Sequence, residues 1–139
     1  AITPAAGFVS PGAAVLIVAG GAILSFGAAR FIRNALQIDD PMDVFATHAV
    51  SGMFGTLALG VFLAPQLGGT GYASGMNMAR QMIAQTAGAG TAIAVAVVGS
   101  AILALGISLF IPMRISEAQE NDGLDAVFSE PEKEPVEEV

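Results

Sequence analysis

The sequence contains no cysteine, no tryptophan and a single tyrosine, and charged residues make up only 12% of its 139 residues. The absence of cysteine excludes disulfides, thiolate metal ligands and a cysteine nucleophile. The shortage of large aromatic side chains leaves little of the usual aromatic belt at a membrane interface. A soluble domain carries about 25% charged residues, whereas this chain is 54% hydrophobic. The composition therefore predicts a membrane protein.

The net charge of −7 belongs to one end of the chain. Residues 114–139 hold nine of the 12 acidic residues and two basic ones, Arg114 and Lys133. In residues 1–113 the charges cancel, because three arginines face three aspartates. We therefore expect two parts, a membrane domain over residues 1–113 and an acidic tail over residues 114–139.

Three apolar stretches reach the roughly 20 residues that a membrane-spanning helix needs. They cover approximately residues 12–32, 43–64 and 82–112. The fold class predicted from them is all-α, a polytopic membrane helix bundle with three spanning helices and a tail. Arg30, Arg33 and Arg114 fall on one face, so the positive-inside rule predicts that the tail is cytoplasmic.

Small side chains recur at every fourth position of the third stretch, which predicts close packing against a neighbouring helix. The positions are Ala84, Gly88, Ala92, Ala96, Ser100, Ala104 and Ser108.

An acidic cluster precedes the second stretch and is typical of a helix start. Asp40 is placed to be the N-cap, with Pro41 at the first helical position and Asp43 at the third. Carboxylates there accept bonds from unpaired backbone N–H groups and favour the positive end of the helix dipole. We therefore expect Asp40 and Asp43 to be capping residues near the mouth of any pore.

His48 is the only histidine in a run from Val44 to Ala79 that contains no Asp, Glu, Lys or Arg, and it lies one turn inside the second stretch. An ionisable group at membrane depth costs several kcal/mol and is by default a candidate functional residue. Its neutral imidazole offers one acceptor and one donor and can pass a proton. From the residues alone two interpretations stay open: contact with a small permeating species, or a hydrogen bond that packs two helices. No metal site, cofactor or enzyme is expected, since no acidic residue or second histidine accompanies it.

Three motifs together resemble the ammonium transporter (Amt) family. They are AITPAAGFVSPG at residues 1–12, DDPMDVFATHAVSG at 39–52 and RISEAQENDGLD at 114–125. The resemblance implies the ninth to eleventh helices of an eleven-helix fold that forms homotrimers with one pore per subunit. His48 matches the pore histidine of the tenth helix, and Val44 matches a pore-lining position one turn below it. Ala49 and Ser51 depart from the family, which usually has glycine at both positions.

The tail matches a family motif that docks against neighbouring subunits, on a face that PII-type signalling proteins bind in many prokaryotic members. The matching residues are Glu117, Glu120, Gly123, Leu124 and Asp125. After Asp125 the sequence departs from the family, because the expected His-Gly-Glu is missing and Val127-Phe128-Ser129-Glu130 follows.

The resemblance implies ammonium or ammonia transport across a cell membrane, with the lipid bilayer as surroundings and no nucleic-acid partner. Because the chain starts at Ala1 without a methionine, we expect a C-terminal fragment of a longer protein that supplies the other pore histidine. Two alternatives remain: an ammonium sensor built on the same fold, and a three-helix membrane scaffold that transports nothing.

Overall fold

The computed structural model describes residues 1–38 and 40–114, and every regular element within them is helical. The chain forms two compact units, Ala1–Val95 and Ala96–Val139, and the second is described as far as residue 114. In chain order the elements are the 3-10 helix η1 (Thr3–Ala5), α1 (Pro11–Asn34), the π-helix η2 (Phe45–Val50), α2 (Ser51–Phe62), the 3-10 helix η3 (Pro65–Leu67) and α3 (Met78–Ser108).

Three of the described helical stretches are long and apolar enough to cross a membrane, namely Pro11–Asn34, Phe45–Phe62 and Met78–Ser108. The predicted fold class, an all-α membrane helix bundle, is therefore confirmed. Each observed stretch overlaps the range predicted from hydropathy. The differences lie at the ends, where capping groups rather than apolar side chains decide the boundary.

α1 begins where local chemistry provides a cap. Ser10 is extended and its hydroxyl accepts the Ala13 N–H at 3.3 Å, while Pro11 occupies the first helical position. Proline is suited to that position because it has no N–H to leave unpaired. Arg33 lies in the last turn, where a cation favours the negative end of the helix dipole.

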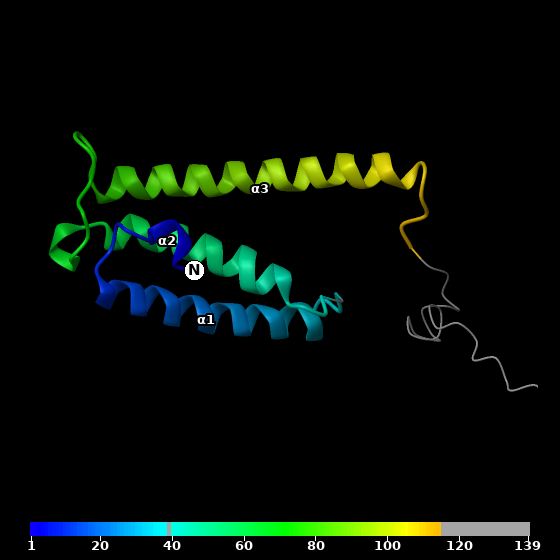
Figure 1. Ribbon diagram of the computed structural model, residues 1–139, viewed down its shortest axis with the longest axis horizontal. Coiled ribbons are helices and arrows are strands. Elements are labelled where there is room, and N and C mark those ends of the chain that lie inside the picture. Colours follow the sequence, from blue (N-terminus) through cyan, green and yellow to red (C-terminus); the bar gives the residue numbers. More distant parts are fainter. Residues whose placement is uncertain (39, 115–139) are drawn as a thin grey trace, which may run out of the picture. The chain divides into compact units, whose positions relative to one another are not determined.

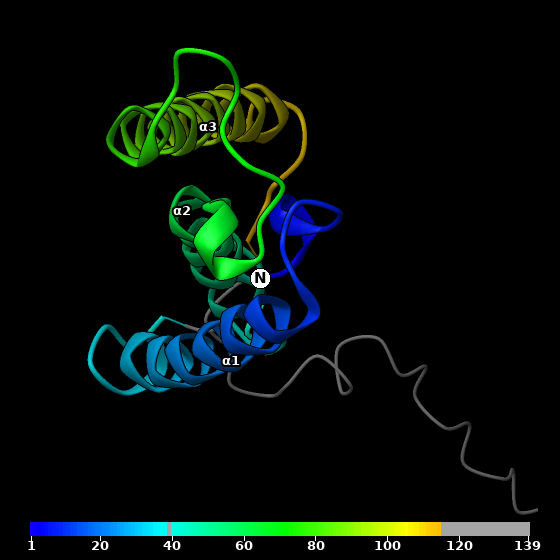
Figure 2. The same ribbon diagram turned by 90° about the vertical axis from the view of Figure 1, so that its left-hand side faces the viewer.

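Within the first unit, α1 and the η2–α2 stretch run antiparallel and side by side (Figures 1 and 2). Close approach is possible because a glycine faces an aromatic ring. A Cβ on Gly20 would lie 2.8 Å from Cζ of Phe54. The core cluster consists of Ala5, Ile17, Ala58, Leu59 and Leu63, so η1 packs into the same core as the two longer helices.

The loop after α2 is compact, as its glycine content predicts. Gly68 adopts the left-handed conformation, with φ of 78°, at the end of η3. The Tyr72 hydroxyl donates to the Gly60 carbonyl at 3.0 Å, and the Thr70 N–H donates to the Phe8 carbonyl at 3.0 Å. These bonds tie the loop to α2 and to the turn before α1.

α3 starts earlier than the apolar pattern suggests because Asn77 caps it, accepting the Arg80 N–H at 2.9 Å. Its 31 residues span about 46 Å, more than a hydrocarbon core of about 30 Å requires. If a Cβ were added to any of four glycines of α3, no heavy atom of a neighbouring segment would lie within 4 Å of it. These glycines are Gly88, Gly90, Gly99 and Gly106. The packing predicted for its small side chains therefore stays a prediction, since no described residue covers those glycines.

Candidate functional site

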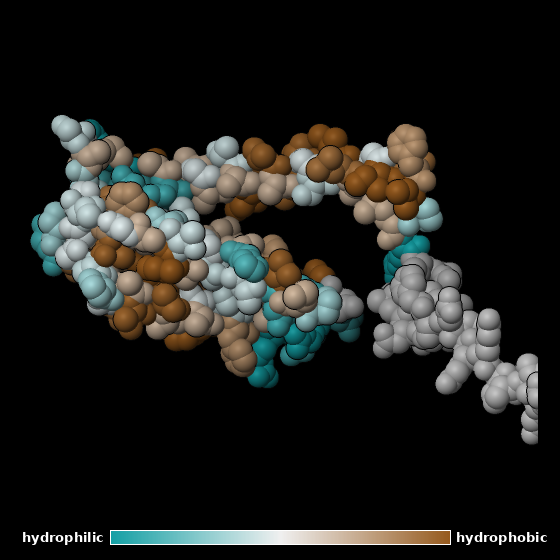
Figure 3. Space-filling view, viewed as in Figure 1, coloured by the Kyte–Doolittle hydropathy of each residue, from teal (hydrophilic) through white to brown (hydrophobic). Residues whose placement is uncertain are grey.

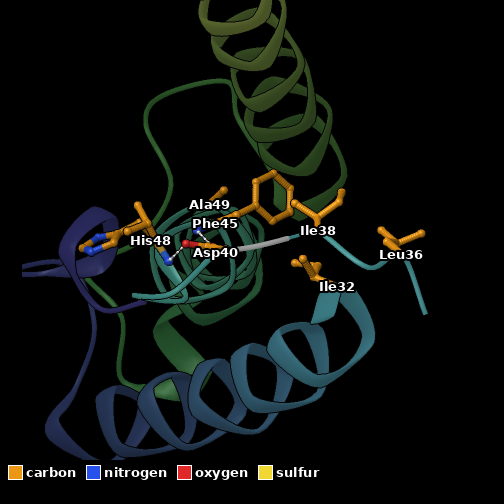
Figure 4. A pocket seen from close by; sticks show the side chains of 8 residues that line it. Ile32, Leu36, Ile38, Asp40, Phe45, His48 and Ala49 are labelled. Carbon is orange, nitrogen blue, oxygen red and sulfur yellow. Dashed lines mark hydrogen bonds between the residues drawn. The ribbon is translucent and has the colours of Figure 1, made fainter. Parts of the chain in front are cut away.

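The site is built on the turn that connects α1 to η2. The Asp43 N–H donates to the Asp40 carbonyl at 3.0 Å and closes a turn over Pro41 and Met42. The two carboxylate oxygens of Asp40 accept the Val44 N–H at 3.0 Å and the Phe45 N–H at 2.9 Å (Figure 4). One side chain thus satisfies two of the unpaired donors at the start of the helical stretch.

Asp43 is placed differently from the expectation. The expected positions of Pro41 and Asp43 inside the first helical turn are wrong, because the helical stretch begins at Val44 and Asp43 has a positive φ of 50°. Aspartate tolerates this left-handed conformation better than most residues. The Asp43 carboxylate accepts a bond from Arg33 at 2.8 Å, and its carbonyl accepts the Thr47 N–H at 2.8 Å. It therefore joins the end of α1 to the start of η2 rather than capping a backbone N–H with its side chain.

Hydrophilic side chains cluster where α1 ends and the turn begins (Figure 3). This end of the α1–α2 pair is the one at which Arg33 and Asp43 meet, with the Arg33 side chain 62% and the Asp43 side chain 35% exposed. These two charged side chains are therefore at the surface and do not form a buried charge network.

His48 lies in the middle of the π-helix η2, a feature that the sequence analysis missed. π-helical turns are rare and occur frequently at functional sites. A π-helical turn differs from an α-helical turn in its hydrogen-bond register, and no spacing pattern in six residues distinguishes the two.

The His48 side chain is exposed and lines a groove of about 630 Å³. Val44, one turn earlier and 50% exposed, lines the same groove. The imidazole points away from Ile38 and Leu36, which lie on the other side of Asp40 and Phe45 in Figure 4. The remaining lining residues are Ile32, Leu36, Ile38, Asp40, Phe45 and Ala49.

This groove is apolar apart from the His48 imidazole and the Asp40 carboxylate, which is engaged with the backbone. Within residues 1–38 and 40–114, no group hydrogen-bonds to the imidazole, and no cluster of histidine, aspartate and glutamate could hold a metal ion. Both nitrogens are thus available to a small donor or acceptor.

The expected tail motif lies outside the described residues. This applies to all five of its positions, Glu117, Glu120, Gly123, Leu124 and Asp125.

Comparison with known proteins gives a consistent result. The model of the Ammonium Transporter Family matches residues 1–132. Among curated relatives, the ammonium transporter of Bacillus subtilis is 34% identical over 90% of this chain and 31% of its own length. Ammonium transporter 2 of Arabidopsis thaliana is 33% identical over 93% of this chain and 30% of its own. The ammonium transporter of Aquifex aeolicus is 32% identical over 86% and 28%, respectively. The chain therefore spans about a third of the length of these relatives, which are named as transporters.

Proposed function

Because this chain belongs to the ammonium transporter family, we propose that it forms part of a path by which ammonium or ammonia crosses a membrane, with His48 and Val44 lining that path. Its three apolar helices make it a membrane protein, in agreement with the family. The observation that carries the proposal is the exposed His48 imidazole in a membrane-length stretch, beside an apolar groove and without a hydrogen-bond partner among the described residues.

The chemistry suits a small nitrogen species. A neutral imidazole accepts a bond from an ammonium N–H through one ring nitrogen and donates to the ammonia lone pair through the other. Apolar walls such as Val44 and Phe45 disfavour an ion without its hydration shell, because an isolated charge in an apolar medium is costly. The groove therefore favours passage of the neutral molecule, and His48 supplies the polar contact that compensates for lost water.

Asp40 and Asp43 support this arrangement from the end of the groove. The Asp40 carboxylate accepts hydrogen bonds from the first two backbone N–H groups of the helical stretch, and the Asp43 carboxylate accepts one from Arg33 at the end of α1. Both act on the backbone that carries Val44 and His48. They are therefore proposed as supporting residues near the entrance, not as groups that bind the substrate.

The proposal extends to a larger assembly. The parts of the path that this chain does not supply come from further helices of the same fold, and the working unit is a homotrimer in a cell membrane. Residues 1–113 form its membrane part and residues 114–139 a cytoplasmic tail, on the side of Arg30 and Arg33, where a PII-type signalling protein could bind. Support comes from the family match and from the basic residues at the end of α1.

Uptake of labelled methylammonium tests the proposal. The gene product that contains this chain is expressed in full in cells without ammonium uptake of their own, as the parent protein and as His48→Ala. We expect uptake by the parent and a loss of at least about tenfold in the variant, since losing one strong polar contact in the barrier costs about 1.4 kcal/mol or more. Thr86→Val is a matched control, because the Thr86 hydroxyl only donates to the Met82 carbonyl within α3. Equal uptake by parent and His48→Ala at equal membrane levels would contradict the pore assignment.

A further inference from the structure

Ser51 occupies the junction at which the π-helix η2 ends and α2 begins. Its backbone N–H donates to the His48 carbonyl, three residues back. The Thr47 carbonyl, which a continuous α-helix would join to that N–H, accepts the Ser51 hydroxyl instead. The Ser51 side chain thus bonds to the carbonyl that its own backbone N–H would reach in a continuous α-helix.

A second hydroxyl in the same stretch shows why this bond differs from an ordinary one. Thr56 donates to the Gly52 carbonyl at 2.9 Å, also four residues back, but it does so inside the regular α-helix α2. There both residues belong to the same α-helix. At Ser51 the hydroxyl donates to the carbonyl four residues back while the backbone N–H of the same residue donates to His48, so the two donors of Ser51 bond to different carbonyls.

Ser51 is also held from the opposite side. It is 6% exposed, and its Cβ would lie 3.7 Å from a Cβ built on Gly21 of α1. His48, in contrast, is exposed on the groove. Within one helical turn, the Ser51 side chain is therefore buried and the His48 side chain is exposed.

We propose that Ser51 is a positioning residue for His48: its hydroxyl, bonded to the Thr47 carbonyl, fixes the π-helical turn that carries the groove-lining imidazole. The inference rests on the proposed transport function and adds to it a residue that never touches the substrate. Without the hydroxyl, the turn can adopt an α-helical conformation, in which the Ser51 N–H donates to the Thr47 carbonyl. That change of hydrogen-bond register rotates the His48 side chain about the helix axis.

The test uses the full gene product in the methylammonium assay. Ser51→Ala removes the hydroxyl with little change in volume, and Thr56→Val is the matched control because it removes a hydroxyl that donates to the carbonyl four residues back within α2. A net hydrogen bond of about 1 kcal/mol corresponds to a shift of roughly fivefold in the population of the correct turn. We expect Ser51→Ala to lower the maximal uptake rate roughly fivefold and Thr56→Val to leave it near the parent value.

A double variant separates positioning from general damage. If Ser51 acts through His48, adding Ser51→Ala to His48→Ala causes no further loss of the residual uptake, whereas a purely structural defect lowers it again. Failure of the transport proposal would appear as unchanged uptake in His48→Ala alone. An impaired His48→Ala together with a fully active Ser51→Ala would overturn only the role of Ser51.

Should Ser51→Ala not accumulate in the membrane, Ser51→Cys provides the second variant, since its thiol is a weaker donor of similar size. We then expect uptake between that of the parent and that of His48→Ala. Full parent activity in Ser51→Cys, with the same activity in Ser51→Gly, would overturn the inference.

Discussion

The guanidinium of Arg33 lies 2.8 Å from the carboxylate of Asp43, so the last turn of α1 is fastened to the residue that precedes η2. Asp43 is at the same time one of two non-glycine residues with positive φ among those described. The ion pair therefore secures a backbone conformation that is itself unfavourable, at the point from which the helical stretch bearing His48 begins.

Breaking this pair has a small, salt-dependent effect. Because both side chains are solvated, we expect Arg33→Gln to cost about 0.2–1 kcal/mol of unfolding free energy. Thermal unfolding of the purified protein in detergent checks this at low and at high salt, and the difference from the parent shrinks at high salt because exposed charges are screened. A loss that is large and independent of salt would show that the pair does more than join two exposed ends.

Removing the Asp40 cap costs more. Asp40→Ala deprives two N–H groups, those of Val44 and Phe45, of their acceptor, and the expected loss is about 1–2 kcal/mol. Asp40→Asn retains one side-chain oxygen and should fall between the parent and the alanine variant. Amide hydrogen exchange measures the effect locally. Faster exchange at residues 44 and 45 in Asp40→Ala is expected, and unchanged protection there would contradict the capping role.

Gly20 is predicted to be intolerant of a side chain, whereas Gly27 in the same helix is not. A Cβ on Gly20 would press on the Phe54 ring, but one on Gly27 meets nothing within 4 Å. We expect Gly20→Ala to destabilise by about 1–3 kcal/mol through overpacking, and Gly27→Ala to be neutral or slightly stabilising. Thermal unfolding in detergent distinguishes them. The smaller side chain of Phe54→Leu should restore part of the loss in Gly20→Ala, and equal behaviour of the two alanine variants would refute the proposed contact.

Filling the groove should slow uptake without unfolding the protein. Val44→Phe adds a ring to a side chain that lines the groove, while Val97→Phe makes the same change on α3 at a side chain that is 63% exposed. We expect methylammonium uptake to fall by at least about tenfold in Val44→Phe, an added barrier of about 1.4 kcal/mol. Val97→Phe should transport like the parent. An active Val44→Phe would remove Val44 from the path.

The sequence was sufficient for the parts of this structure that depend on composition and local chemistry. Three apolar stretches predicted the three spanning helices, and the resemblance of three motifs predicted the family, both of which are confirmed. The position of Asp40 before the second stretch predicted a cap, and its carboxylate accepts two backbone N–H groups.

What the sequence did not predict depends on three-dimensional context. The left-handed Asp43 and its bond to Arg33 join residues from two elements, and no local rule pairs them. The π-helix over Phe45–Val50 differs from an α-helix by one residue in its hydrogen-bond register, and six residues are too few for a period to be measured. Asn77 before α3 was a missed signal, because asparagine is among the preferred N-cap residues.

The most direct test of the central claim measures flux in a purified system. The full gene product is reconstituted into liposomes that contain a pH-sensitive dye, an ammonium gradient is imposed, and the initial rate of internal pH change is recorded for the parent and for His48→Ala. If His48 lines the path, the parent exceeds empty liposomes, and His48→Ala at equal protein content loses at least about tenfold of that excess. Equal rates for parent and variant, both above empty liposomes, would contradict the account.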